Sequence, residues 1–321
     1  MIYAREYHEI EIDRTLKPST YTLVLYIWKG SSDGLPVEAE YSITKTNIEN
    51  TDTPDYINIS PLVLDFIEPI QNNFTEGINN YNEAVWVEWQ VFLNDDLTYS
   101  QRGIDLAVNG YSTEDKEILL NGGEFSMCDT FIVPFKTGNT VTVVSQPNNE
   151  INDSYATSSS LLSNEQIKHI LIKRPYSDKY IKVSNGSEDY YIYLEDKNKH
   201  QVNEVKYINS YGAIQVLPFY SERKDKLTVN KETYKAKAFN TNHKYVNFNL
   251  NGRESISLQS NYHSEESNKA FESMFMSEFV WCNDIPVNLK TTSISYKSRV
   301  NDKLISYEIE LELSKDKIRT F

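Results

Sequence analysis

Cysteine, glycine and proline are scarce in this chain, and it has no long apolar run. Its 321 residues include 2 Cys, 11 Gly and 10 Pro. Collagen-like and low-complexity chains are rich in Gly or Pro, so the composition excludes both classes and indicates a globular protein. No stretch approaches the roughly 18 apolar residues that a membrane-spanning helix needs, and residues 1–6 lack the basic and apolar regions of a secretory signal. Neither secretion nor membrane insertion is therefore expected.

The two cysteines, Cys128 and Cys282, lie in different halves of the chain. Their separation matches no metal-binding spacing, and disulfides are rare in a reducing cytoplasm. We therefore expect two small buried thiols and no disulfide.

Motifs for catalysis and cofactor binding are missing as well. The five histidines lie far apart, and none has another His or Cys at the i+2 or i+4 spacing of a compact metal site. They are His8, His169, His200, His243 and His263. Gly122-Gly123 predicts a turn rather than a phosphate-binding loop. The sequence thus predicts no catalytic residue, no metal site, no cofactor and no enzyme, although the paired carboxylates of a glycosidase meet only in the folded chain and stay open among 46 acidic residues.

Basic residues are absent between Thr51 and Gln101, and the two halves of the chain differ in charge. Residues 1–150 carry a net charge of −16 and residues 151–321 a net charge of +2, against −14 for the whole chain. A surface this acidic repels DNA, RNA and anionic lipids at ordinary ionic strength. Three interpretations stay open: a solvated surface that aids solubility, a face for a basic partner, or the border of a passage through which DNA slides.

Residues that favour strands are abundant: the chain has 23 Tyr and 13 Phe, and aromatic residues make up 12% of it. In the first half, alternating or short apolar runs predict eight or so strands with polar turns, which is typical of a sandwich or jelly roll. They are 9–13, 21–28, 37–44, 85–92, 103–108, 117–120, 131–133 and 141–144. Aromatic residues on both faces of 85–92 indicate a strand that is central or covered on both sides. Ser60-Pro61 predicts the cap and first residue of a short helix.

A polar stretch at 148–163, rich in Asn, Asp and Ser, predicts a linker. The predicted fold is therefore mainly β, with one β-rich domain at 1–147 and another at 164–321. In the second domain, Asn185-Gly186 between two β-prone runs predicts a hairpin. The strands expected there are 167–172, 180–183, 190–194, 204–208, 213–219, 234–239, 246–250 and 255–258.

The last third of the chain combines an amphipathic helix with an alternating hairpin. A helix is predicted at 264–279, with Ser264 as its cap and one apolar face, which is typical of a helix packed on a sheet. The residues of this face are Phe271, Met274, Phe275 and Phe279. A hairpin is predicted at 293–313, because apolar residues alternate with acidic ones in its second arm. They are Tyr307, Ile309, Leu311 and Leu313 against Glu308, Glu310 and Glu312.

Four segments of this last third carry a family resemblance. They are FNLNGRESISL at 248–258, MSEFVW at 276–281, PVNLK at 286–290 and VNDKLISYEIEL at 300–311. They resemble virion proteins from tailed phages of Bacteroidetes hosts, the crAss-like phages among them, and the likeness covers roughly residues 165–321. The resemblance implies a structural component of the tail or head-to-tail region, a ring or hub subunit to which fibres or neighbouring rings attach. Its motifs are packing and turn residues, so it implies no catalytic residue.

The leading interpretation is a structural virion protein that forms a homo-oligomeric ring and links neighbouring rings and tail fibres around the DNA conduit. We expect other phage tail or neck proteins as partners, assembly in the host cytoplasm, and neither sequence-specific nucleic acid binding nor a membrane. Two alternatives stay open. The Tyr, Trp and Asn content suits sugar contacts, so a carbohydrate-binding receptor-recognition module is one. A tail-associated depolymerase is the other.

Overall fold

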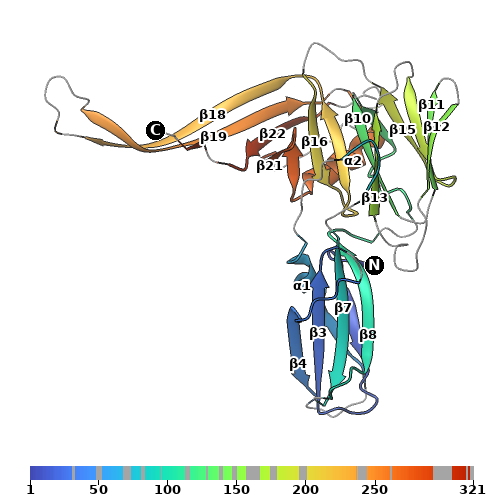
Figure 1. The fold of residues 1–321 in the computed structure, drawn as a ribbon. Coiled ribbons are helices and arrows are strands. Elements are labelled where there is room, and N and C mark those ends of the chain that lie inside the picture. The colour runs from blue at the N-terminus through green and yellow to red at the C-terminus, as the bar shows by residue number, and fades with distance from the viewer. Residues whose placement is uncertain are drawn as a thin grey trace.

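The computed structural model of the protein describes most of its 321 residues. The described ranges are 1–30, 33–47, 53–67, 74–80, 84–94, 96–112, 116–127, 129–136, 140–146, 150–156, 167–173, 179–194, 201–235, 237, 244–260, 262–291, 306–315 and 317–318. Within them the protein is mainly β, as the sequence predicts, with 23 strands, two α-helices and one short 3-10 helix. No helix in these ranges is long and apolar enough to cross a bilayer. Figure 1 shows three parts: a lower lobe, a larger body and a long hairpin that projects from the body.

The N-terminal lobe consists of the described residues from 1 to 67 and from 84 to 112. Its main sheet has the strand order β1-β8-β7-β3-β4. These strands are β1 (Ile2–Tyr3), β3 (Thr20–Trp28), β4 (Tyr41–Thr46), β7 (Val85–Leu93) and β8 (Gln101–Val108). A two-stranded ladder of β2 (Glu9–Ile12) and β5 (Asp55–Asn58), followed by α1 (Ser60–Leu64), shares one apolar core with this sheet. The lobe therefore has two layers of unequal size.

β7 is the central strand of the main sheet, as its aromatic residues on both faces predict. Glu88 on this strand is only 1% exposed. Arg102 on β8 donates from Nε and Nη2 to the two carboxylate oxygens of Glu88, at 2.8 Å each. Gly103 lies opposite Trp89, and a Cβ at this glycine would lie 2.5 Å from the indole ring. Position 103 therefore requires glycine, because a side chain there would clash with the Trp89 ring.

α1 begins differently from the prediction. Pro61 lies in its first turn as expected, but Ile59 rather than Ser60 is the N-cap residue, and no side chain caps the helix. Ser60 is buried, donates its hydroxyl to the carbonyl oxygen of Glu6 and accepts the His8 N–H at 3.0 Å. The serine therefore ties the N-terminal segment to the helix instead of capping it.

The body contains three sheets. Their strand orders are β10-β13-β6, β12-β11-β14-β15-β9 and β17-β16-β20-β21-β22-β19-β18, with β23 beside β19. The strands are β6 (Gly77–Asn80), β9 (Glu124–Met127), β10 (Thr130–Lys136), β11 (Thr140–Gln146), β12 (Glu150–Ala156), β13 (Ile167–Lys173), β14 (Tyr180–Ser184), β15 (Asp189–Leu194), β16 (Asn203–Ile208), β17 (Ile214–Phe219), β18 (Arg223–Lys235), β19 (Tyr245–Gln259), β20 (Val280–Cys282), β21 (Ile285–Leu289), β22 (Glu308–Leu313) and β23 (Lys317–Ile318). One continuous apolar cluster joins residues of all three sheets with α2 (Asn268–Phe275).

The chain does not divide at the predicted linker, 148–163. β12 occupies 150–156 and pairs with β11, so a strand lies inside the predicted linker. Pairs across this stretch, β13 with β6 and β15 with β9, join the two predicted domains in shared sheets. The prediction was wrong because β12 is an edge strand, and edge strands tolerate polar residues. The chain instead passes from the N-terminal lobe into the body near Gly110.

Most of the predicted strands are confirmed, and three predictions need correction. Residues 117–120 form no strand, since Ile118 makes only an isolated bridge to Phe135. The runs 246–250 and 255–258 belong to one strand, β19, and β18 begins at Arg223, well before the predicted 234–239. The start of β18 was missed because all its residues are exposed and most are polar, so the few apolar ones, such as Leu227 and Val229, do not make the long alternation that marks a half-buried strand.

The hairpin predicted around Asn185-Gly186 is confirmed as β14 and β15. The Asn185 side chain accepts the N–H groups of Ser187 at 3.1 Å and Glu188 at 2.7 Å, and Gly186 has a positive φ of 96°. Both features are the usual chemistry of Asn-Gly turns.

The predicted helix at 264–279 is shorter in the structure. A 3-10 turn at Glu265–Ser267 precedes α2, which ends at Phe275. Ser264 is the N-cap residue of this 3-10 turn, as predicted, but its side chain makes no cap hydrogen bond and instead donates to the Glu124 carboxylate at 2.8 Å. Phe279 lies beyond the helix, just before β20, and its carbonyl oxygen accepts the Ile208 N–H. The packing of Phe271 and Met274 in the core is confirmed.

The predicted hairpin at 293–313 is corrected in its pairing. Its first arm, 293–300, lies outside the described residues. β22, within the second arm, pairs with β19 on one side and β21 on the other. The acidic alternation also breaks at Glu312, which is only 9% exposed. Lys290 at 2.7 Å and Arg253 at 3.0 Å surround its carboxylate and lower its pKa.

Candidate functional site

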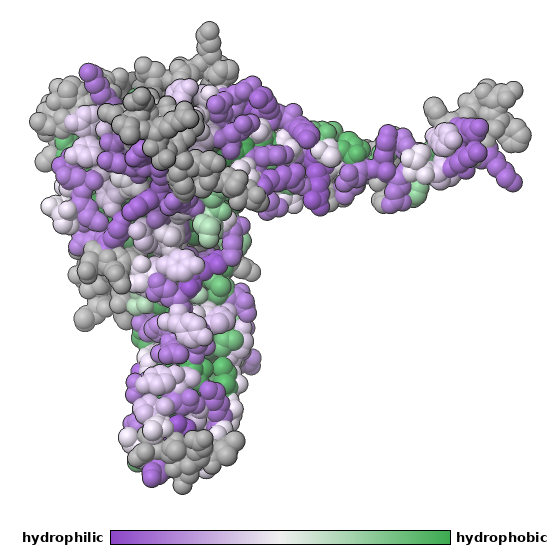
Figure 2. All heavy atoms as spheres, turned by 180° about the vertical axis from the view of Figure 1, so that it is seen from behind, coloured by the Kyte–Doolittle hydropathy of each residue, from purple (hydrophilic) through white to green (hydrophobic). Residues whose placement is uncertain are grey.

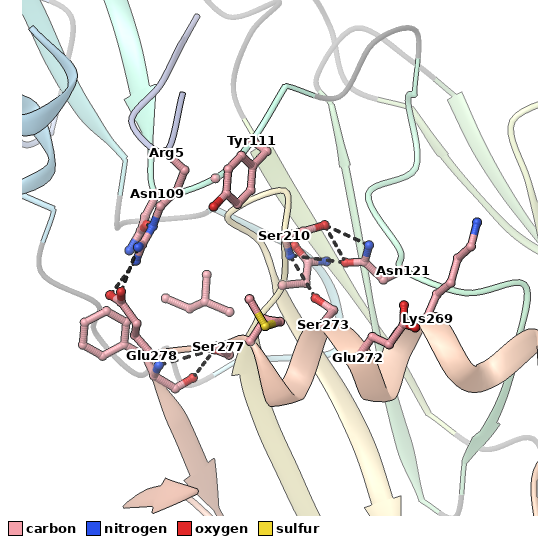
Figure 3. Close-up of a pocket in the computed structure, with 15 residues that line it drawn as sticks. Arg5, Asn109, Tyr111, Asn121, Ser210, Lys269, Glu272, Ser273, Ser277 and Glu278 are labelled. Atoms are coloured by element: carbon pink, nitrogen blue, oxygen red, sulfur yellow. Dashed lines mark hydrogen bonds and ion pairs between the residues drawn. The ribbon is translucent and has the colours of Figure 1, made fainter. Parts of the chain in front are cut away.

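A pocket of about 460 Å³ lies where the N-terminal lobe meets the body. Three segments, together with Asn121 and the N-terminal Arg5, form its walls (Figure 3). The segments are 109–111 after β8, 208–210 after β16, and 269–279 from α2 to the turn before β20. We call this the junction pocket.

One wall of the junction pocket is an ion pair between the lobes. Arg5 donates from Nη1 and Nη2 to the two carboxylate oxygens of Glu278, at 2.8 and 2.5 Å. Its Nε donates to Asn109 at 2.6 Å. Hydrogen bonding by Arg5 lowers the pKa of Glu278, and the same bond raises the pKa of Arg5. Both groups therefore stay charged at neutral pH.

The opposite wall is a network of amides and hydroxyls. Asn121 donates to the hydroxyl of Ser210 at 2.9 Å, and the Ser210 N–H donates to the hydroxyl of Ser273 on α2 at 3.0 Å. Behind them, Gln215 exchanges two hydrogen bonds with the backbone of Asn121, each 3.0 Å long. Gln215 is fully buried. The wall is therefore preorganised, because each polar group has a partner that fixes its orientation.

Two backbone segments touch directly at the base of the pocket. A Cβ at Gly110 would lie 2.3 Å from the carbonyl carbon of Tyr211. The N–H of Tyr111 donates to the carbonyl oxygen of Ser210 at 2.7 Å. Only glycine at 110 allows this approach, so the connection between lobe and body depends on this residue.

The lining suits hydrogen bonding better than nucleophilic catalysis. The lining contains amides, hydroxyls and the half-exposed ring of Tyr111, and none of its residues is a His or a Cys. The hydroxyl of Ser277 is already held by the backbone of Phe279. No local sequence pattern marks this pocket, because its residues come from segments far apart in the chain.

The histidines that the structure describes are dispersed and structural. His169 is fully buried, its Nε2 accepts the Ile214 N–H at 3.1 Å, and burial lowers its pKa to about 3. His263 packs its ring 5.1 Å from that of Phe271, and burial lowers its pKa to about 4. Burial also lowers the pKa of the half-buried His8. His200 and His243 lie outside the described residues.

Cys282 is buried, as predicted, and burial raises the pKa of its thiol to about 11. Cys128 lies outside the described residues. Over the part of the chain that is described, no three His, Cys, Asp or Glu side chains gather into a possible metal site.

Gly122-Gly123 leads into β9, and the Gly123 N–H donates to the carbonyl oxygen of Glu266 at 3.2 Å.

The second candidate site is the hairpin arm, which we define as the described residues of 223–259, that is β18, β19, Lys237 and Lys244. All 13 residues of β18 are exposed. Five large apolar side chains on the arm are between 45% and 64% exposed. They are Leu227, Val229, Tyr234, Tyr245 and Phe248. Figures 1 and 2 show the arm projecting from the body as a narrow ribbon, mostly hydrophilic with apolar side chains among the charges.

No protein-family model, no curated protein and no solved structure matches this chain. The fold and the two candidate sites are therefore interpreted from their own geometry.

Proposed function

We propose that this protein is a structural, non-enzymatic subunit of a tailed bacteriophage virion. In this proposal several copies form a ring in the tail or head-to-tail region, which links neighbouring rings and tail fibres around the DNA conduit. The assignment to a phage rests on the resemblance of roughly residues 165–321 to virion proteins. The assignment to an assembly role rests on the hairpin arm.

The hairpin arm is the observation that carries the assembly role. A two-stranded hairpin is at best marginally stable alone in water, and exposed apolar groups on a soluble monomer are usually scattered singly. Here aromatic and aliphatic side chains recur along one projecting ribbon, and Tyr234 and Phe248 contact each other at 5.7 Å between ring centroids. Such a ribbon is suited to binding another protein, which would cover the aromatic residues and add strand neighbours.

The charge distribution agrees with a site beside a DNA conduit. Residues 53–67 and 84–94 of the N-terminal lobe contain no Lys or Arg. A negatively charged surface repels DNA, so a ring lined by this lobe would let DNA pass without binding it. If particle images placed this lobe wholly on the outer rim, the conduit part of the proposal would be wrong and the ring part would stand.

Oligomeric state tests the assembly role. We expect mass photometry and negative-stain images of the purified chain to show closed rings, or assembly into rings when other tail proteins are added. A chain that stays monomeric at micromolar concentration and joins no virion component would contradict the proposal. So would turnover of a capsular polysaccharide, because that result would support a depolymerase.

The junction pocket favours a second candidate, a carbohydrate-binding receptor-recognition module. Tyr111 is half exposed beside fixed amide and hydroxyl groups, and aromatic faces with amides are the common chemistry of sugar recognition. A glycan array would test it, with Tyr111→Ala against Tyr99→Ala, which removes a similarly exposed tyrosine elsewhere on the N-terminal lobe. Loss of a glycan signal in the first variant alone would support this candidate.

A further inference from the structure

The hairpin arm is the most basic projecting part of the molecule. Residues 223–259 hold eight Lys or Arg and three acidic residues, a net charge of +5. Along the arm, Lys226, Lys231, Lys235, Lys237 and Lys244 are all exposed. The exposed apolar side chains lie along the same strands, so the arm presents both charge and apolar area.

The outer part of the arm has little support from the other described residues of its chain. β22 pairs with β19 only up to Ser255, and β23 pairs with it at Asn251 and Gly252. Beyond these positions, the described residues of β18 and β19 pair only with each other. A strand of 13 residues spans about 43 Å, at about 3.3 Å per residue. A ribbon this long, with one end unsupported, would be stabilised by a partner that covers it.

The N-terminal lobe offers a surface of opposite charge. Residues 1–67 and 84–112 hold 15 acidic and 6 basic residues, a net charge of −9. On β2, Glu9 and Glu11 point to solvent while Ile10 and Ile12 are buried. Glu11 lies opposite Tyr56 of β5, and Tyr56 is about half exposed. Residues opposite each other in a ladder share a face, so this acidic face also presents an aromatic ring.

The arm points away from the N-terminal lobe of its own chain. In Figure 1 it leaves the body sideways while the lobe extends downward, and Figure 2 shows the same separation from behind. A contact between the basic arm and the acidic face therefore requires two molecules.

We infer that the hairpin arm of one copy docks on the acidic β2–β5 face of a neighbouring copy. The inference rests on the proposed ring, because it supplies the contact between subunits. The two surfaces are different, so the contact is heterologous, and it closes into a ring where the rotation between neighbouring copies divides a full turn. Ammonium and carboxylate groups would guide the encounter, and the apolar side chains of the arm would pack against Tyr56.

Charge reversal on each side tests the inference. One variant combines Lys231→Glu with Lys235→Glu on the arm, and the other combines Glu9→Lys with Glu11→Lys on the lobe. We expect each variant alone to weaken self-association at least tenfold in sedimentation velocity at about 100 mM salt. An equimolar mixture of the two variants should recover heterologous association, because their reversed surfaces are complementary again. The matched control, Lys173→Glu with Lys179→Glu, changes the charge equally on the body and should associate like the parent chain.

The outcomes separate the two levels of the proposal. If the parent chain and both variants form the same oligomer, the arm contact is wrong and the ring stands. If the parent chain neither self-associates nor joins any virion component, the proposed ring is wrong. The arm contact, which depends on the ring, is then wrong as well. If the arm variant loses binding to a DNA duplex while self-association is unchanged, the arm is a nucleic-acid ribbon and the inference is overturned.

Discussion

Arg5 and Glu278 join the two lobes by a bidentate ion pair, with N–O distances of 2.8 and 2.5 Å. They are 273 residues apart in sequence, and one comes from the N-terminal segment while the other follows α2. The Glu278 side chain is 57% exposed and that of Arg5 is 24% exposed, so water screens much of the attraction. The pair therefore acts more on the orientation of the lobes than on the stability of the fold.

Replacing Glu278 by Gln should leave the fold intact and loosen the junction. We expect the free energy of unfolding to fall by less than about 1 kcal/mol, the usual range for partly exposed ion pairs. Small-angle scattering should show a broader distribution of distances between the lobes. Glu38→Gln, at an exposed position of the N-terminal lobe, is the matched control and should change neither quantity. A loss of several kcal/mol would mean that the junction belongs to the core.

Replacing Arg102 by Met should be more costly, because it leaves a buried carboxylate without its partner. Glu88 is only 1% exposed; burial favours its neutral form, but the hydrogen bonds from Arg102 and Gln90 outweigh burial and lower its pKa. We expect a loss of roughly 1–3 kcal/mol in denaturant unfolding at pH 7. The loss should shrink as pH falls toward 4, since a protonated Glu88 needs no cation. A loss that does not vary with pH would contradict this account.

The two buried histidines predict a loss of stability in mild acid. Their folded pKa values, about 3 for His169 and about 4 for His263, lie below the ordinary 6.5. The unfolded chain therefore takes up protons first, and stability that is present above pH 6.5 falls as pH decreases toward 4. Each histidine contributes up to about 1.4 kcal/mol per pH unit.

His263→Phe should remove one of these two contributions, because phenylalanine fills the site beside Phe271 and does not titrate. Between pH 6.5 and 4.5 the slope of unfolding free energy against pH should fall by up to about 1.4 kcal/mol per unit. His8→Gln is the control, and its effect should be smaller because His8 is only half-buried. An unchanged slope in His263→Phe would show that this histidine is not buried in its neutral form.

Gly110→Ala should force the lobe and body apart at their backbone contact. The added Cβ would lie 2.3 Å from backbone that cannot move freely. We expect the free energy of unfolding to fall by about 1–3 kcal/mol, the common cost of overpacking. Gly123→Ala is the control, because its nearest neighbour is the flexible Glu266 carboxylate at 3.2 Å. Equal thermal stability of the two variants would show that the contact at Gly110 is not tight.

The sequence predicts those parts of the fold whose burial is one-sided. β2, β3, β14, β15 and the core face of α2 follow from alternation, from an Asn-Gly turn or from helical spacing. It does not predict β18 or β12, because an exposed strand and an edge strand place polar residues on both faces. The wrong prediction of a linker at 148–163 has the same cause. A polar stretch of sequence indicates residues away from an apolar core, but such residues need not form a domain boundary.

The sites were harder to predict than the strands. The junction pocket depends on contacts such as Asn121 with Ser210, which are 89 residues apart. No local pattern encodes such a meeting. The arm did leave a signal that could have been used: lysines recur from Lys224 to Lys237 beside β-branched and aromatic residues. That combination is typical of a solvated ribbon, and reading it would have placed β18 correctly.

Shortening the arm separates its role in assembly from any role in folding. Asn230 and Asn251 face each other in the ladder, so an Asn-Gly turn can join them in place of residues 231–250. The described residues that are removed add no side chain to the apolar core clusters, so the unfolding free energy of the monomer should change by less than about 0.5 kcal/mol. Self-association should disappear at every salt concentration, since apolar and charged contacts are lost together. A shortened chain that still formed rings would show that another surface joins the subunits, and a chain that unfolded far more easily would show that the arm stabilises its own body.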